Sequence, residues 1–328
     1  MKLASSLSRR KVLGFAAAQL AFGSMQVSAQ IPDSRPLRIV IPFSVGSQTD
    51  VIARLMSRPM SDRLKQTVVV ENRPGASGTI GAQALLTEPA NGNSLLFVSG
   101  AYAVLPVAGL KLPYDPAKDL EAVSIVARSP LVLIASKGTG FKSLSDLLKA
   151  ARAKPEALSF ASSGIGSSTH LCAEYFANAG GFKALHIPLK GGRDMLNEVL
   201  ANRVDFAFLP PSDLIGFGPD KVTQLGVTGK QRVPLAPTAV PIAESGLSGF
   251  EYFLWQALLV KAETPAARLS ALHGSIMYAL ADPEVAKRFE DLGIEALKLD
   301  LNGSRSFVAQ QMASNAELVK SRGLKLSE

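Results

Sequence analysis

Apolar residues along the chain fall into two alternating patterns, which are short continuous runs and longer segments with helical spacing. Each run has the length of a buried strand. The runs lie at residues 37–41, 67–70, 94–99, 158–161, 185–189, 204–209 and 222–228. Apolar residues three and four positions apart predict helices at residues 52–64, 79–86, 143–153, 171–179, 266–280, 283–292 and 304–322. A further helix is expected to follow the turn at residues 190–194 and to end at Leu200. Strands that alternate with helices predict mostly parallel sheets with helices on both faces.

Two apolar runs are longer than the others, at residues 123–135 and 252–260. A long extended run can carry the chain from one domain to another, and the second run would bring it back. We therefore expect two α/β lobes, the first of them built from both ends of the chain. Residues 30–127 and 253–328 are assigned to lobe 1, and residues 128–252 are assigned to lobe 2.

The turn at residues 42–50 joins the first predicted strand to the first predicted helix. It contains glycine and hydroxyl residues, and Thr49 and Asp50 stand where a helix N-cap is expected, with the helix starting at Val51. Backbone N–H groups at a helix N-terminus converge on one point and attract anions. The turn therefore predicts an anion pocket, although an ordinary capped strand-to-helix turn has the same features.

Two further loops repeat this chemistry. Residues 71–78 and 162–168 are polar, contain glycine and serine, and lead from a predicted strand into a predicted helix. In α/β sheets, loops of this kind follow the carboxyl ends of the strands, which is where ligands bind. The repetition favours the anion pocket over three unrelated turns.

Residues 1–29 have the three parts of an export signal. A basic segment is followed by an apolar stretch at residues 12–22 and by small residues at a cleavage site. The stretch is too short to span a bilayer, and no later segment approaches a span. The pair Arg9 and Arg10 resembles a twin-arginine signal, but a general secretory signal that contains two arginines fits equally well. Either signal predicts removal of the segment near Ala29 and a soluble protein in the periplasm.

Much of the net charge comes from this N-terminal segment. The formal net charge is +8, from 35 Lys and Arg against 27 Asp and Glu. Residues 1–29 hold four of the basic residues and no acidic one, so 31 basic residues face 27 acidic residues in the remainder, a net charge of +4. Aromatic residues make up 6% of the chain and no basic stripe is present. The sequence therefore predicts no nucleic-acid partner.

Cysteine and histidine are too few for a disulfide or a metal site. The single cysteine, Cys172, lies on an apolar helix face and is expected in the core. The three histidines are scattered and lack metal-ligand spacing. Gly164 and Gly166 are not followed by the third glycine of a dinucleotide-binding loop. We expect neither a metal nor a cofactor.

Ser167 and His170 are the pair that most resembles a catalytic group. They stand three positions apart at a helix start, where a nucleophile and a base would share one face. The sharp glycine-flanked turn that presents the serine of many hydrolases is absent. We interpret His170 as a residue that holds the loop in place, and we predict that the protein is not an enzyme.

A series of short motifs runs through residues 36–322 in a fixed order. The motifs are Val-Glu-Asn-Arg-Pro-Gly-Ala-Ser-Gly at 70–78, Leu-Pro-Tyr-Asp-Pro at 112–116, Ser-Gly-Ile-Gly-Ser-Ser-Thr-His-Leu at 163–171, His-Ile-Pro-Leu-Lys-Gly at 186–191, Val-Asp at 204–205, Leu-Gly-Val-Thr at 225–228 and Glu-Ser-Gly at 244–246, with Glu174 and Trp255. In this order and spacing, the chain resembles the Bug family, the periplasmic solute-binding proteins of tripartite tricarboxylate transport systems.

The resemblance implies a two-lobed α/β clamp of the periplasmic binding protein type II kind. Its ligand would be a small organic anion, namely a di- or tricarboxylate, an acidic amino acid or an aromatic acid, held between the lobes by backbone and hydroxyl groups. The ligand-binding residues implied by the resemblance are Gly46, Ser47, Gln48 and Thr49 of the first loop, Ser77 and Gly78 of the second, Gly166, Ser167 and Ser168 on lobe 2, and Asp205 near the cleft. We expect a monomer.

Several positions depart from the family pattern, among them Leu189, which replaces a tyrosine. Ser47 replaces the second of two glycines in the first loop, and Gln48 replaces a small residue. Gln48 adds a side-chain amide that can form a hydrogen bond with a polar group of the ligand. Lys261 and Glu263 replace a proline and a glycine after the second long run. Because the first loop differs, the ligand cannot be transferred from any relative.

Three functions stay open from the sequence. The closed protein would be recognised by the membrane subunits of a transporter, or by a sensor kinase if the ligand is a signal. The third is an exported enzyme, a hydrolase or a protein that binds a cofactor before twin-arginine export.

Overall fold

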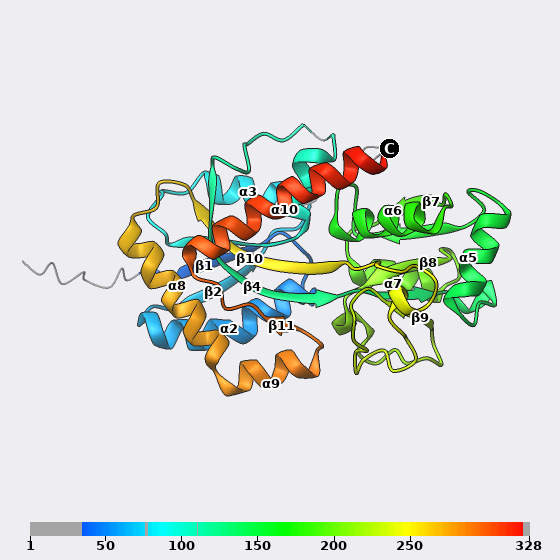
Figure 1. Cartoon of the computed structure of the whole chain (residues 1–328). Coiled ribbons are helices and arrows are strands. Elements are labelled where there is room, and N and C mark those ends of the chain that lie inside the picture. Colours follow the sequence, from blue (N-terminus) through cyan, green and yellow to red (C-terminus); the bar gives the residue numbers. More distant parts are fainter. Residues whose placement is uncertain (1–34, 76–77, 110, 324–328) are drawn as a thin grey trace, which may run out of the picture. The chain divides into compact units, whose positions relative to one another are not determined.

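Two mixed sheets, each covered by helices on both faces, form the framework of the protein (Figure 1). The computed structural model describes residues 35–75, 78–109 and 111–323. The predicted export signal lies outside these residues. The described residues from Arg35 onward belong to one compact unit. The division into two lobes at the predicted boundaries therefore stays a proposal.

The larger sheet has six strands in the order β11-β4-β10-β3-β1-β2. Its strands are β1 (Leu37–Ile41), β2 (Val68–Asn72), β3 (Ser94–Ser99), β4 (Leu120–Pro130), β10 (Phe253–Lys261) and β11 (Glu295–Ala296). β1 pairs in parallel with β2 and β3, whereas β10 runs antiparallel to β3 and β4.

The smaller sheet has five strands in the order β7-β6-β8-β5-β9. Its strands are β5 (Val132–Ala135), β6 (Ser159–Ser162), β7 (Leu185–Pro188), β8 (Phe206–Leu209) and β9 (Thr223–Val227). β6 pairs in parallel with β7 and β8, but β5 is antiparallel to both of its neighbours. The α/β class is confirmed, while the sheets contain more antiparallel pairing than the strand–helix alternation predicted.

The antiparallel pairs follow from the two long strands that connect the sheets. Only Leu131 separates β4 from β5, so the chain passes directly from the larger sheet into the smaller one. β10 returns alongside β4, with Phe253 opposite Pro130 and Lys261 opposite Leu120. A strand that returns beside the one that left must run in the opposite direction.

The helices lie close to their predicted positions, except for the short helix Ala101–Val104, which the sequence pattern did not predict. They are α2 (Gln48–Leu64), α3 (Thr79–Leu86), α4 (Ala101–Val104), α5 (Leu144–Ala153), α6 (Ser168–Gly180), α7 (Gly192–Leu200), α8 (Ala266–Ala281), α9 (Pro283–Asp291) and α10 (Leu301–Arg322). α5 carries the capping box between Ser143 and Asp146 that its sequence predicts. α2 begins three residues earlier than Val51 and continues through Pro59.

Buried apolar side chains fill both faces of each sheet. Ile39 of β1 packs with α2, α8 and α9 on one face, whereas Val40 packs with α3, α4 and α10 on the other. In the smaller sheet, α5 and α6 cover one face and α7 covers the other. Cys172 is fully buried, as predicted. No helix in the described residues is both long enough and apolar enough to cross a bilayer.

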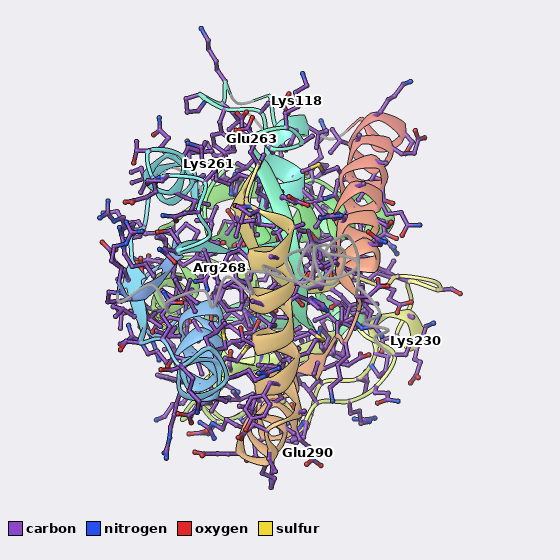
Figure 2. The ribbon with its side chains drawn as sticks, turned by 90° about the vertical axis from the view of Figure 1, so that its left-hand side faces the viewer. Lys118, Lys230, Lys261, Glu263, Arg268 and Glu290 are labelled. Carbon is purple, nitrogen blue, oxygen red and sulfur yellow. The ribbon has the colours of Figure 1, made fainter. Side chains whose placement is uncertain are left out.

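The residues that depart from the family pattern after β10 have local structural roles. The Lys261 ammonium donates to the carbonyl groups of Leu86 and Glu88 at 2.9 and 3.1 Å, and so binds the last turn of α3. Glu263 adopts φ +71°, a backbone conformation that favours glycine. Figure 2 labels Lys261 and Glu263 beside Arg268 at the start of α8. The two replacements therefore lie away from the predicted ligand loops.

Candidate ligand-binding site

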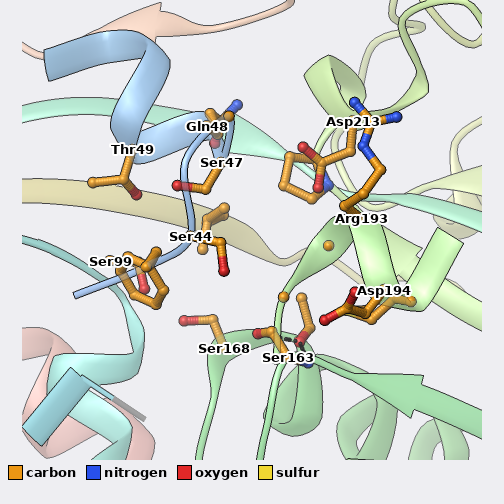
Figure 3. A pocket seen from close by; sticks show the side chains of 18 of the residues that line it. Ser44, Ser47, Gln48, Thr49, Ser99, Ser163, Ser168, Arg193, Asp194 and Asp213 are labelled. Atoms are coloured by element: carbon orange, nitrogen blue, oxygen red, sulfur yellow. Dashed lines mark hydrogen bonds between the residues drawn. The ribbon is translucent and has the colours of Figure 1, made fainter. Parts of the chain in front are cut away.

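A cavity of about 310 Å³ is lined by loops that extend from both sheets (Figure 3). The loop after β1 contributes Ser44 to Thr49 from the larger sheet. The smaller sheet contributes the loop after β6, the start of α7 and the segment after β8. Each of these loops follows the carboxyl end of a strand, where α/β sheets bind their ligands.

The loop after β1 is fixed by reciprocal hydrogen bonds. Ser47, and not Thr49 or Asp50, is the N-cap of α2, and its hydroxyl accepts from the backbone N–H of Asp50 at 3.3 Å. The Asp50 carboxylate accepts in return from the N–H of Gly46 at 2.9 Å. Gly46 has φ +80°, so the turn needs glycine at this position. The first-turn N–H groups of α2 have no partner within the helix and lie beside the cavity.

Asp50 is buried and heavily hydrogen-bonded beneath this loop. It accepts from the Arg54 guanidinium and from the amide of Asn72, both at 3.0 Å. Burial alone would raise the pKa of Asp50, but the bonds from Arg54, Gly46 and Asn72 hold it below its ordinary value. The carboxylate is therefore ionised and braces the loop that lines the cavity.

Gln48 is buried between the loop and the two connecting strands. Its side-chain oxygen accepts from the Gln256 amide at 2.6 Å and from the Ser129 hydroxyl at 3.2 Å. Its side-chain nitrogen is buried and has no hydrogen-bond partner among the described residues. Gln48 also lines the cavity, so an unpaired buried amide lies in the wall of the site.

The loop after β6 is braced by hydroxyl groups. Thr169 lies at its centre, where its hydroxyl is 3.0 Å from that of Ser163 and 3.1 Å from that of Ser167. Ser167 is the N-cap of α6 and accepts from the backbone N–H of His170. Ser163, Ser168 and Thr169 line the cavity at this helix start.

A buried aromatic stack supports the same loop from below. The His170 ring lies 3.8 Å from that of His186 and accepts the N–H of Gly166 through Nδ1, so His170 holds the loop as predicted. Burial and the neighbouring His186 lower the pKa of His170 to about 3. His170 contacts Ser167 through its backbone, whereas a hydrolase would need its ring there.

The start of α7 forms a third wall that the sequence did not assign to the site. Gly191, Gly192 and Arg193 line the cavity there, together with Asp213 from the segment after β8. The sequence predicts a strand-to-helix turn at residues 190–194, but it does not link Gly191, Gly192 or Arg193 to the ligand loops. The signal was present, because it is a fourth glycine-containing turn before a helix.

The predicted site residues differ in where the structure places them. Gly46, Ser47, Gln48, Thr49 and Ser168 line the cavity. Gly166 and Ser167 lie in the loop behind it, and Gly78 lines a separate, smaller hollow. Ser77 lies outside the described residues.

Asp205 does not reach the cavity. It precedes β8, at the edge of the sheet opposite the ligand loops, and its carboxylate accepts from the N–H and hydroxyl of Ser159 at 2.7 and 2.8 Å. We therefore no longer include Asp205 in the candidate site. Among the described residues, no group of three or more His, Cys, Asp or Glu side chains has an arrangement that could hold a metal ion.

Comparison with protein families places this arrangement in a known group. The model of the tripartite tricarboxylate transporter family receptor matches residues 52–324. The chain belongs to this receptor family. It is 35% identical over 89% of its length to a protein encoded in the tcbD-tcbE intergenic region of Pseudomonas sp. (strain P51), of which it covers 88%. Protein BugT of Bordetella pertussis (strain Tohama I) is 32% identical, with 92% of this chain and 93% of that protein covered.

Solved structures of the receptor family share the fold. The periplasmic binding protein BugD superposes with a TM-score of 0.81 at 31% identity, covering 88% of this chain and 98% of BugD. An R. palustris protein solved with adipate superposes with a TM-score of 0.82 at 28% identity, covering 89% of this chain and 98% of that protein. The Bug-family resemblance and the type II binding-protein fold are thereby confirmed.

Proposed function

We propose that this receptor binds a small carboxylate in the cavity between its two sheets and passes it to the membrane subunits of a tripartite transporter. The observation that carries the proposal is the lining of the cavity, where the starts of α2 and α6 present uncharged donors. Helix starts attract anions through their free N–H groups and the helix dipole. The relative solved with adipate supports a carboxylate as the ligand.

Binding without catalysis is part of this proposal. The ligand meets hydroxyl and amide donors from both sheets, so it binds best when the loops lie close around it. The two lobes, residues 30–127 with 253–328 and residues 128–252, would close as the connecting strands β4 and β10 bend. The protein acts as a monomer in the periplasm after the export signal is removed near Ala29.

A binding panel tests the proposal. Succinate, malate, aspartate, citrate, adipate and benzoate are titrated into the purified mature protein by calorimetry and in thermal melts. We expect at least one carboxylate to raise the melting temperature, because a ligand that binds only the folded state stabilises it. Ser168→Ala should weaken that binding about tenfold by removing one hydroxyl donor. Ser145→Ala, on the exposed face of α5, is the matched control.

Two further results would distinguish the proposed uptake receptor from a cofactor-binding protein and from a sensor. If no carboxylate binds and a chromophore or metal co-purifies, the protein is an exported cofactor-binding protein instead. Uptake and sensing are distinguished by deleting the gene and measuring import of the bound carboxylate. Import that persists while ligand-induced transcription is lost would assign the receptor to a sensor.

A further inference from the structure

Asp213 is a carboxylate inside the cavity that no other described residue binds. It lies in the short helical turn Pro211–Leu214 that follows β8. Figure 3 shows it across the pocket from Ser47 and Gln48, beside Arg193. No hydrogen bond or ion pair joins its side chain to another described residue. Asp213 and Asp194 are the two carboxylates among the lining residues, and the Asp213 carboxylate is an acceptor without a donor among the described residues.

The Asp213 carboxylate packs against the first residue of α7, the third helix that begins at the cavity. A Cβ atom placed on Gly192, the first residue of α7, would stand 1.8 Å from Asp213 Oδ2, so the carboxylate lies directly against that residue. The start of α7 therefore has a carboxylate packed against it, although no N–H group of this helix donates a hydrogen bond to Asp213 among the described residues. Gly192 is required here because any side chain would displace Asp213.

The charges around Asp213 do not neutralise it. The Arg193 guanidinium lies 5.6 Å from the ring of Phe217, and it forms no ion pair with Asp213 among the described residues. The remaining charged group of the wall, Asp194, has the same sign as Asp213. Burial raises the pKa of Asp213 to about 7, against the opposing effect of Arg193. Near neutral pH, Asp213 therefore exchanges between an acceptor and a neutral acid.

We propose that Asp213 selects carboxylates that carry a hydroxyl or ammonium group next to the carboxylate, because such a donor pairs with the free acceptor on the α7 side of the cavity. This selection rests on the proposed carboxylate-binding function and defines its ligand class. A plain dicarboxylate places no donor against Asp213 and meets a like charge there. It binds well only to the protein whose Asp213 is protonated.

The two ligand classes have opposite pH dependences. A donor-bearing ligand binds the ionised Asp213, so its affinity rises as the pH increases through 7. A plain dicarboxylate binds the protonated form, so its affinity falls over the same range. For a group that titrates near 7, each change between pH 6 and pH 8 is about tenfold, in opposite directions.

Succinate, malate and aspartate form a matched set for the experiment, because they share one four-carbon dicarboxylate skeleton and differ in a single substituent. Their affinities are measured by calorimetry at pH 6, 7 and 8 for the wild-type protein and for Asp213→Asn. At pH 8, we expect malate or aspartate to bind at least about tenfold more tightly than succinate. If malate binds more tightly than aspartate, Asp213 prefers a hydroxyl donor, and if aspartate binds more tightly, it prefers an ammonium donor.

Asp213→Asn should remove both the preference and the opposite pH slopes while succinate still binds. Asp220→Asn, an exposed residue seven positions along the same segment, is the control and should keep the wild-type pattern. If the three ligands bind equally tightly and Asp213→Asn changes nothing, the selection is wrong although the carboxylate function stands. If none of the three ligands, nor any other carboxylate in the panel, binds either protein, the proposed function itself fails.

Discussion

At the scale of single residues, the site depends on side chains that hold the loops as well as on those that line the cavity. The resemblance to the Bug family implied Ser47, Gln48 and Ser168 as ligand-binding residues, and all three line the cavity. The sequence did not identify Asp213. That residue reaches the cavity only because the segment after β8 folds against α7, a contact that no local pattern encodes.

Asp50 gives a prediction at this scale. Asp50→Asn keeps the shape of the side chain but removes the charge that binds Gly46, Arg54 and Asn72. We expect a loss of about 1–3 kcal/mol in the free energy of unfolding and a loss of about tenfold in ligand affinity. Urea denaturation and calorimetry measure the two effects. Asp62→Asn, on the exposed face of the same helix, should change neither, and equal effects of both variants would contradict the bracing role.

At the scale of elements, the periodicity of apolar residues predicted most of the helices and strands. α3 and β3 have the predicted bounds, since each is a regular apolar segment with clear turn residues at its ends. The start of α2 was placed too late, because Gln48 and Thr49 are polar but buried in the first turn of the helix. The direction of strand pairing could not be read locally, since it depends on where β10 returns in the sheet.

The loop-supporting helix α6 carries a second prediction. Burial raises the pKa of Glu174 to about 7 from its ordinary 4.5. The His170 ring lies 3.8 Å from the carboxylate, but its lowered pKa leaves it neutral, so it does not offset this effect. The ionised carboxylate is therefore disfavoured in the folded protein. Its protonated form supports folding fully below pH 4.5, and this contribution is lost as the pH rises through 7. The loss is at most about 3 kcal/mol at pH 8, from 1.36 kcal/mol per pKa unit.

Glu174→Gln isolates this effect because glutamine does not titrate. We expect the variant to gain stability relative to the wild type as the pH rises from 5 to 8, in urea denaturation at each pH. The quantity compared is the difference in free energy of unfolding between the two proteins at each pH. The titration of His170 occurs near pH 3, below the measured range, and is present in both proteins. Glu290→Gln, an exposed position on α9, should run parallel to the wild type. A constant difference between Glu174→Gln and the wild type would show that Glu174 is not destabilised by burial.

At the scale of the whole molecule, two sheets joined by β4 and β10 bring loops from distant parts of the chain around one cavity. The two long apolar runs indicated this connection, because an extended segment of that length can carry the chain from one sheet to the other. Family membership places the protein among the tripartite tricarboxylate transporter family receptors. The central claim is that uncharged donors at the starts of α2 and α6 hold the ligand anion.

A crystal structure with the tightest-binding carboxylate of the panel tests this claim most directly. The account predicts carboxylate oxygens at about 2.7–3.2 Å from donors in both loops, at Gln48 or Thr49 on one side and Ser168 or Thr169 on the other. A carboxylate that binds elsewhere, or that lies in the cavity without touching either helix start, would contradict it.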